Sequence, residues 1–183
     1  IPIDYNVADF SKMIKEKENA NALFIFIDNT NDHYTTNSHR DPIKEIRLYN
    51  PIGSKNNKPK SAGISCGADS KSYFNNIESM VFGLISKDGS TSIAIVKNII
   101  DRDIDEIEQL LKSYAYDKIY VPVDANYTSL NLTPVIPNNT LSKDVNDYIL
   151  NHIKILGKYC KINDTHASNK DMENKETNIG QQV

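Results

Sequence analysis

Apolar residues recur along this chain in two rhythms, one typical of helices and the other typical of buried strands. Steps of three and four residues predict helices over residues 7–17, 73–85, 91–113 and 142–156. The helix over 91–113 is the clearest, because its apolar residues share one face and the polar residues within 101–108 form the opposite face. Ser142 is well suited to cap the start of the last helix.

Other apolar runs predict strands. Residues 23–27 form an unbroken run that is too short for a helix and typical of a strand buried on both faces of a parallel sheet. Residues 119–123 give a second such strand, whose Pro122 is expected at an edge or beyond the ladder. Alternation over 43–49 predicts a half-exposed strand. Residues 61–70 predict a short strand that runs into a glycine-bearing turn.

Strands that alternate with helices indicate an α/β fold with a mostly parallel central sheet flanked by helices. The 183 residues suffice for one layered domain of ordinary size, which we assign to residues 1–160. Residues 50–60 are dense in Gly, Pro, Asn and Lys and predict a turn or loop. No apolar period recurs after Lys161, so residues 161–183 are expected to form a disordered polar tail.

Composition narrows the classes of function. A hydrophobic fraction of 39% and a charged fraction of 25% are those of a globular protein. The formal net charge of -3 argues against a general nucleic-acid-binding surface. No segment approaches the roughly 20 apolar residues of a membrane span. We therefore expect a cytoplasmic protein, with secretion by a bacterium into a host cell as the alternative that the C-terminal residues described below suggest.

Two aspartates follow predicted buried strands, Asp28 after residues 23–27 and Asp124 after residues 119–123. If both strands are parallel in one sheet, their carboxylates emerge at the same edge, where open α/β sheets bind ligands. There they could bind a cation, accept a ribose hydroxyl, or act as a base and its orienting partner. The alternative is that each aspartate caps the turn after its strand.

The loop after Asp28 carries His33, His39 and Arg40. Two histidines in one loop could bind a metal together with Asp28 or Asp32, but their spacing matches no zinc-binding pattern, so no metal site is predicted. Arg40 could pair with a phosphate, for which its planar guanidinium is suited. The alternative is a loop of solvated side chains.

Gly63 and Gly67 flank Cys66 before the predicted helix over 73–85. Backbone N–H groups in such a turn can hold an anion, although the segment has neither the complete dinucleotide-binding pattern nor the complete phosphate-loop pattern. Cys66 could act as a nucleophile if a nearby histidine lowered its pKa. The alternative is a buried, inert thiol.

Four stretches resemble a domain found in bacterial and phage proteins that has no assigned activity. They are ALFIFIDN with a histidine after it, EIRLYN, PKSAGISCG before an aromatic residue, and YDKIYVPVD, in this order over residues 22–124. That family has more glycine before the IR-x-Y element and after the AGI turn, where this chain has SHRDPIKEIRLY and GADSKSY. The resemblance implies one compact α/β domain and supplies no reaction.

The polar C-terminus, with Glu173 and Glu176, is similar to the translocation signals of type IV secreted effectors from intracellular bacteria; an ordinary solvated tail is the alternative.

The predicted function is binding of a small phosphorylated or nucleotide-like ligand, with a place in a secreted bacterial effector as a further hypothesis. Its predicted site is formed by Asp28, His33, Arg40, Gly63, Gly67 and Asp124. A hydrolase that uses Asp28 or His33 as base in the same cleft is one alternative. An interaction module that binds a protein partner without a pocket is another. The sequence does not decide between binding and catalysis, and it names no cofactor.

Overall fold

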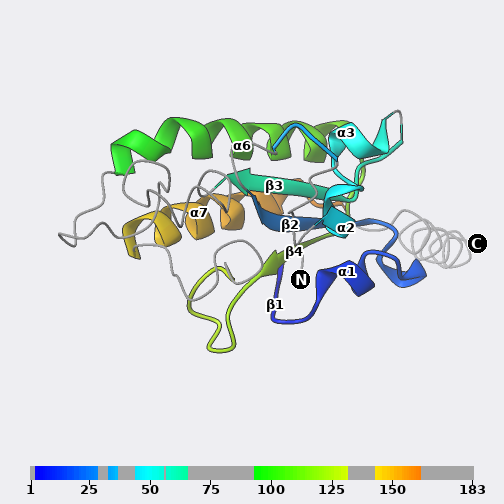
Figure 1. Cartoon of the computed structure of the whole chain (residues 1–183), viewed down its shortest axis with the longest axis horizontal. Helices are drawn as coiled ribbons and strands as arrows, with labels where there is room; N and C mark the ends of the chain where they lie inside the picture. Colours follow the sequence, from blue (N-terminus) through cyan, green and yellow to red (C-terminus); the bar gives the residue numbers. More distant parts are fainter. Residues whose placement is uncertain are drawn as a thin grey trace, which may run out of the picture.

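The computed structural model describes residues 3–28, 33–36, 44–55, 57–65, 93–131 and 143–161 (Figure 1). Its strands are β1 (Ile3–Asn6), β2 (Ala22–Asp28), β3 (Ser61–Ser65) and β4 (Lys118–Pro122). Its helices are α1 (Phe10–Met13), α2 (Lys44–Arg47), α3 (Pro51–Ser54), α6 (Ile93–Ser113) and α7 (Lys143–Leu156), with short 3-10 turns η1 (Lys17–Asn19) and η2 (Gly157–Tyr159). The predicted helix over 73–85, the turn after β3 and the tail beyond Lys161 lie outside these residues.

The four strands form one sheet in the order β1-β4-β2-β3, and every neighbouring pair is parallel. Leu23 of β2 pairs with Ile119 of β4, which confirms that the two apolar runs belong to one sheet. Pro122 lies where the β2 ladder has already ended, and its partner in the sheet is Asn6 of β1. Proline has no backbone N–H, and at this position the lack of that donor removes no hydrogen bond to β2.

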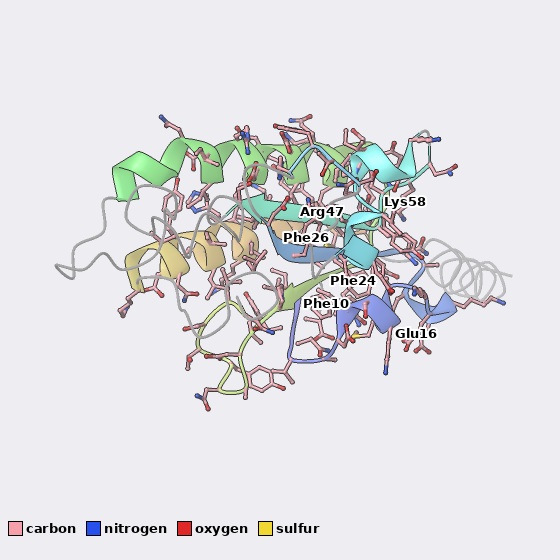
Figure 2. The ribbon with its side chains drawn as sticks, in the orientation of Figure 1. Phe10, Glu16, Phe24, Phe26, Arg47 and Lys58 are labelled. Carbon is pink, nitrogen blue, oxygen red and sulfur yellow. The ribbon has the colours of Figure 1, made fainter. Side chains whose placement is uncertain are left out.

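Helices cover the sheet and its β3 edge. On one face, Phe10 of α1 packs edge-on against Phe24 (Figure 2), with 5.3 Å between ring centroids. Phe24 in turn stacks on Tyr120 at 4.6 Å. Helix α6 runs along β3 and contacts α7 (Figure 1). The two long helices bury apolar residues at the predicted steps of three and four: Ile100, Ile104, Ile107 and Leu111 in α6, and Val145, Ile149, Ile153 and Leu156 in α7. The α/β class and the parallel sheet flanked by helices are thus confirmed.

One predicted element is of the wrong type. Residues 43–49 contain helix α2, not a half-exposed strand. Alternation placed Ile46 and Leu48 on one buried side, but Leu48 is 54% exposed, whereas Arg47 is fully buried. Arg47 tolerates burial because a carboxylate pairs with it, and a hydropathy pattern does not record such pairing.

The predicted helix over 7–17 is shorter than expected. Only α1 forms, and it begins after Asp9, whose carboxylate accepts a hydrogen bond from the Ser11 N–H at 2.9 Å. The preceding residues Ile3–Asn6, for which no element was predicted, pair with β4 as strand β1. Inside the predicted loop, Asn50 caps the single-turn helix α3 and Pro51 occupies its first position.

Within the described residues, no helix combines the length and the apolar composition that a membrane span needs.

Candidate functional site

The buried strand β2 ends in a carboxylate that is itself fully buried. Asp28 Oδ1 accepts a hydrogen bond from the Arg47 guanidinium, and Asp28 Oδ2 lies 2.9 Å from His33 Nδ1. Arg47 also lies over the Phe26 ring, 5.3 Å from its centroid (Figure 2). The sheet thus fixes Asp28, and Asp28 fixes the orientation of the His33 ring.

Gly63 makes room for this carboxylate. A Cβ atom at Gly63 would lie 2.4 Å from Asp28 Oδ2 and 2.8 Å from Asp28 Cβ. No other residue type fits such a close approach without a shift, so glycine is required here by space. Because Gly63 has no side chain, the Asp28 carboxylate has room beside β3 to contact the His33 ring.

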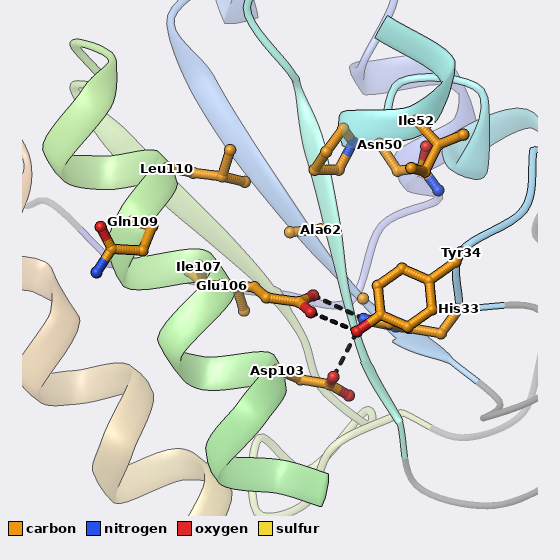
Figure 3. A pocket seen from close by; sticks show the side chains of 12 residues that line it. His33, Tyr34, Asn50, Ile52, Ala62, Asp103, Glu106, Ile107, Gln109 and Leu110 are labelled. Atoms are coloured by element: carbon orange, nitrogen blue, oxygen red, sulfur yellow. Dashed lines mark hydrogen bonds and ion pairs between the residues drawn. The ribbon is translucent and has the colours of Figure 1, made fainter. Parts of the chain in front are cut away.

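The other ring nitrogen of His33 faces α6. His33 Nε2 lies 2.8 Å from Glu106 Oε2 and 3.1 Å from Asp103 Oδ1. The Tyr34 hydroxyl donates to Glu106 Oε1 at 2.6 Å. Figure 3 shows these side chains pointing toward one another from α6 and from the segment after β2. Asp103 and Glu106 share a helix face because they are three residues apart.

Asp103 is tied to the sheet and to a neighbouring arginine. Its Oδ2 accepts a hydrogen bond from the Ser65 N–H at the end of β3, at 2.7 Å. Its Oδ1 faces Arg102 Nε at 2.9 Å. The cluster therefore contains three carboxylates, of Asp28, Asp103 and Glu106, and two guanidinium groups, of Arg47 and Arg102.

These contacts shift the pKa values of the cluster. Burial opposes the charged form of His33, but the hydrogen bonds to Asp28 and Glu106 and the charge of Asp103 outweigh it and raise the pKa of His33 to about 9. Burial also opposes ionisation of Glu106, yet the bonds from His33 and Tyr34 lower its pKa. Burial raises the pKa of Asp103 despite its cationic neighbours. At neutral pH, His33 therefore carries a proton on both nitrogens.

We expect the protein to lose stability as pH rises from 6.5 through 9, because the pKa of His33 in the folded protein lies above its ordinary value. The contribution is complete below the ordinary pKa and disappears above the folded one, and its size is on the order of 3 kcal/mol. Urea unfolding in EDTA across this window measures it. A His33→Gln variant should lack this component, and equal pH profiles of the two proteins would contradict the assignment.

A cavity of about 280 Å³ adjoins the cluster between α3, β3 and α6 (Figure 3). His33, Tyr34, Asp103 and Glu106 form its polar end. The remaining walls are mostly apolar, and they come from Asn50, Pro51, Ile52, Ala62, Gly63, Ile107, Gln109 and Leu110.

The structure brings together three of the six residues predicted from the sequence. Asp28 and His33 are hydrogen-bonded, and Gly63 lies against Asp28. Asp124 follows a parallel neighbour of β2, as expected, but its carboxylate accepts bonds from the Thr128 N–H at 3.0 Å and the Ser129 N–H, so it caps its own turn. It does not line the cavity.

Arg40 and Gly67 lie outside the described residues, as do His39, Asp32 and Cys66. Burial raises the pKa of the Cys160 thiol to about 11.

Sequence reasoning missed Arg47, Asp103 and Glu106. The last two belong to the polar face of α6, where a carboxylate is ordinarily a solvated group. Glu106 lies 73 residues from His33 along the chain and Asp103 only three fewer, so no local pattern links them. Arg47 was read as the outer side of a strand. A charged residue within an otherwise apolar stretch was the only available signal.

No family model matches the chain, and searches of curated proteins and of solved structures gave no match either. Fold and site geometry therefore carry the functional argument, and the resemblance to the bacterial and phage domain stays a prediction.

Proposed function

We propose that this domain binds a small nucleoside-like ligand in the cavity between α3, β3 and α6. The observation that carries the proposal is a cavity with mostly apolar walls and a polar end at His33, Asp103 and Glu106. Ligand sites typically combine apolar surfaces with a few converging polar groups, in volumes of roughly 300–1,000 Å³. A cavity of about 280 Å³ suits a nucleoside or a sugar better than a dinucleotide.

The polarity of the cluster indicates which part of the ligand faces it. Arg47 and Arg102 already face carboxylates, so the polar end offers mainly hydrogen-bond acceptors. Hydroxyl or amino groups suit such acceptors, whereas a phosphate would be repelled by Asp103 and Glu106. A phosphorylated ligand would thus direct its phosphate away from this end.

A hydrolase is the second candidate, and the Asp28–His33 pair favours it. An aspartate that orients a histidine is a common arrangement in acid–base catalysis. Because the pKa of His33 is raised to about 9, this histidine would serve at neutral pH as a proton donor, not as a base. The composition of the C-terminal residues supports the further proposal that the chain is part of a secreted bacterial protein.

A thermal-shift screen of nucleosides, nucleotides and sugar phosphates in EDTA tests the binding proposal. A ligand at about 100 times its dissociation constant should stabilise the protein by roughly 2.7 kcal/mol. We expect Ile52→Trp to abolish that shift, because Ile52 lines the cavity and a larger ring there would block the ligand's entry. The protein should still fold, since the Ile52 side chain is 48% exposed and the ring has room at the mouth of the cavity.

Ile155→Trp on α7 is the matched control, since Ile155 is 58% exposed and does not line the cavity. Equal ligand shifts in both variants would place binding elsewhere. If none of the compounds in these ligand classes shifts the unfolding temperature, the proposal is contradicted.

A further inference from the structure

We infer that His33, Asp103 and Glu106 form a binding site for a divalent transition-metal ion such as Zn²⁺ or Mn²⁺. The inference goes beyond the proposed ligand and does not depend on it. One ligand atom from each of the three side chains lies within 4.8 Å of the other two. His33 and Asp103 are buried, and Glu106 is partly buried beside the cavity.

The separations suit coordination to one ion. Imidazole nitrogens and carboxylate oxygens bind such ions at about 2.1 Å, so two ligands at a right angle lie about 3.0 Å apart. His33 Nε2 lies 3.1 Å from Asp103 Oδ1 and 2.8 Å from Glu106 Oε2. Three ligands on one side of an ion leave its other positions open, as in metal sites that bind a water or a substrate.

Each proposed ligand is oriented through the atom that does not face the ion. Asp28 binds the Nδ1 side of His33, the Ser65 N–H binds Asp103 Oδ2, and the Tyr34 hydroxyl binds Glu106 Oε1. A carboxylate behind a metal-binding histidine is a recurrent outer-shell arrangement that fixes the ring and its tautomer. Three separate elements thus direct Nε2, Oδ1 and Oε2 to one place.

A buried hydroxyl gives an independent observation. Ser65 is fully buried, and its Oγ has no hydrogen-bond partner within the part of the chain that the structure describes. Ser65 pairs with Asp28 across β2 and β3, so its side chain lies on the sheet face of the Asp28 carboxylate. Buried hydroxyls are rarely left without a partner, and a water held by a metal ion would supply one.

The charges and the ligand types indicate the class of ion. The cluster has one more carboxylate than guanidinium groups, and this excess of negative charge favours a cation. Arg102 faces the same Asp103 oxygen, and its partly exposed side chain can move into solvent as the ion binds. Imidazole with carboxylates suits Zn²⁺, Mn²⁺ or Fe²⁺ better than Ca²⁺ or Mg²⁺.

Calorimetric titration of the untagged, metal-free protein with Zn²⁺ tests the inference, with no organic ligand present. We expect saturable binding of one ion, weakened at least about tenfold by Glu106→Gln. Glu108→Gln is the matched control and should bind as the unaltered protein does. Glu108 is on the same helix, and its Oε1 likewise accepts a tyrosine hydroxyl, that of Tyr159 at 2.5 Å.

NMR of the unaltered protein covers the case in which Glu106→Gln does not fold. Zn²⁺ should shift the His33 imidazole resonances and leave the Nδ1 proton in place. Absence of saturable Zn²⁺ binding, equal losses in the two variants, or binding that leaves His33 unshifted would each overturn the inference. Because the ligand screen is performed in EDTA and this titration without ligand, the failure of one proposal is distinguishable from that of the other.

Discussion

Replacement of Arg47 by methionine is expected to destabilise the protein by about 3–5 kcal/mol. Arg47 and Asp28 are both fully buried, and their ion pair lies between α2 and the end of β2. Methionine keeps much of the contact with the Phe26 ring but leaves Asp28 without its guanidinium partner. A buried carboxylate that loses its counter-charge bears the full cost of its removal from water. Urea unfolding measures the change.

Lys15→Met is the matched control for this variant. Lys15 also pairs with an acid, Glu45 of α2, at 3.0 Å, but both side chains are about half exposed. Its loss should cost far less than the loss of Arg47, because ion pairs exposed to water contribute little to stability. The double variant Asp28→Asn with Arg47→Met should cost less than the sum of the two single changes, because the buried charge is then removed as well. Equal effects of Arg47→Met and Lys15→Met would contradict the buried pair.

Gly63→Ala is expected to destabilise the protein by about 1–3 kcal/mol and to lower the pKa of His33. The added methyl group would lie 2.4 Å from Asp28 Oδ2, so the carboxylate must move. Because that same oxygen binds His33 Nδ1, the move weakens a hydrogen bond that favours protonated His33. Urea unfolding gives the stability change, and an NMR titration of the imidazole gives the pKa.

Gly157→Ala is the control, since its Cβ would meet the end of the Ile3 side chain at 2.9 Å and that flexible group can shift. We expect a smaller loss of stability there and no change in the pKa of His33. A Gly63→Ala protein with unaltered stability and an unaltered His33 titration would show that Asp28 is not held as the structure has it.

Periodic patterns predicted the elements that bury long apolar stretches. Strand β2 and helices α6 and α7 lie where expected. A strand buried on both faces needs an apolar residue at each position, and a helix buried on one side needs them at steps of three and four. The patterns failed at β1, for which no element was predicted, and at α2, which was predicted as a strand. Both are four-residue elements whose type is decided by what they pack against.

The candidate site shows the same division. From the sequence alone, Asp28 and His33 could be placed near the end of a central strand, since parallel sheets direct polar groups to their carboxyl ends. Gly63 was predicted in a nearby turn and lies instead within the edge strand β3. Asp124 seemed equivalent to Asp28, but local backbone N–H groups hold it in a turn. That choice depends on loop geometry, which the type of residue after a strand does not determine.

The sequence by itself determined the α/β class, the parallel sheet and the long amphipathic helices, because hydrophobic burial acts at every position and repeats with the period of each element. Only the tertiary structure decided that Arg47 enters the interior and that Asp103 and Glu106 face His33 across the edge strand. Pairing between charged groups depends on distances of a few ångströms between segments far apart in the chain. No periodicity encodes such distances, so the chemistry of the site emerges only when α6 docks against β3.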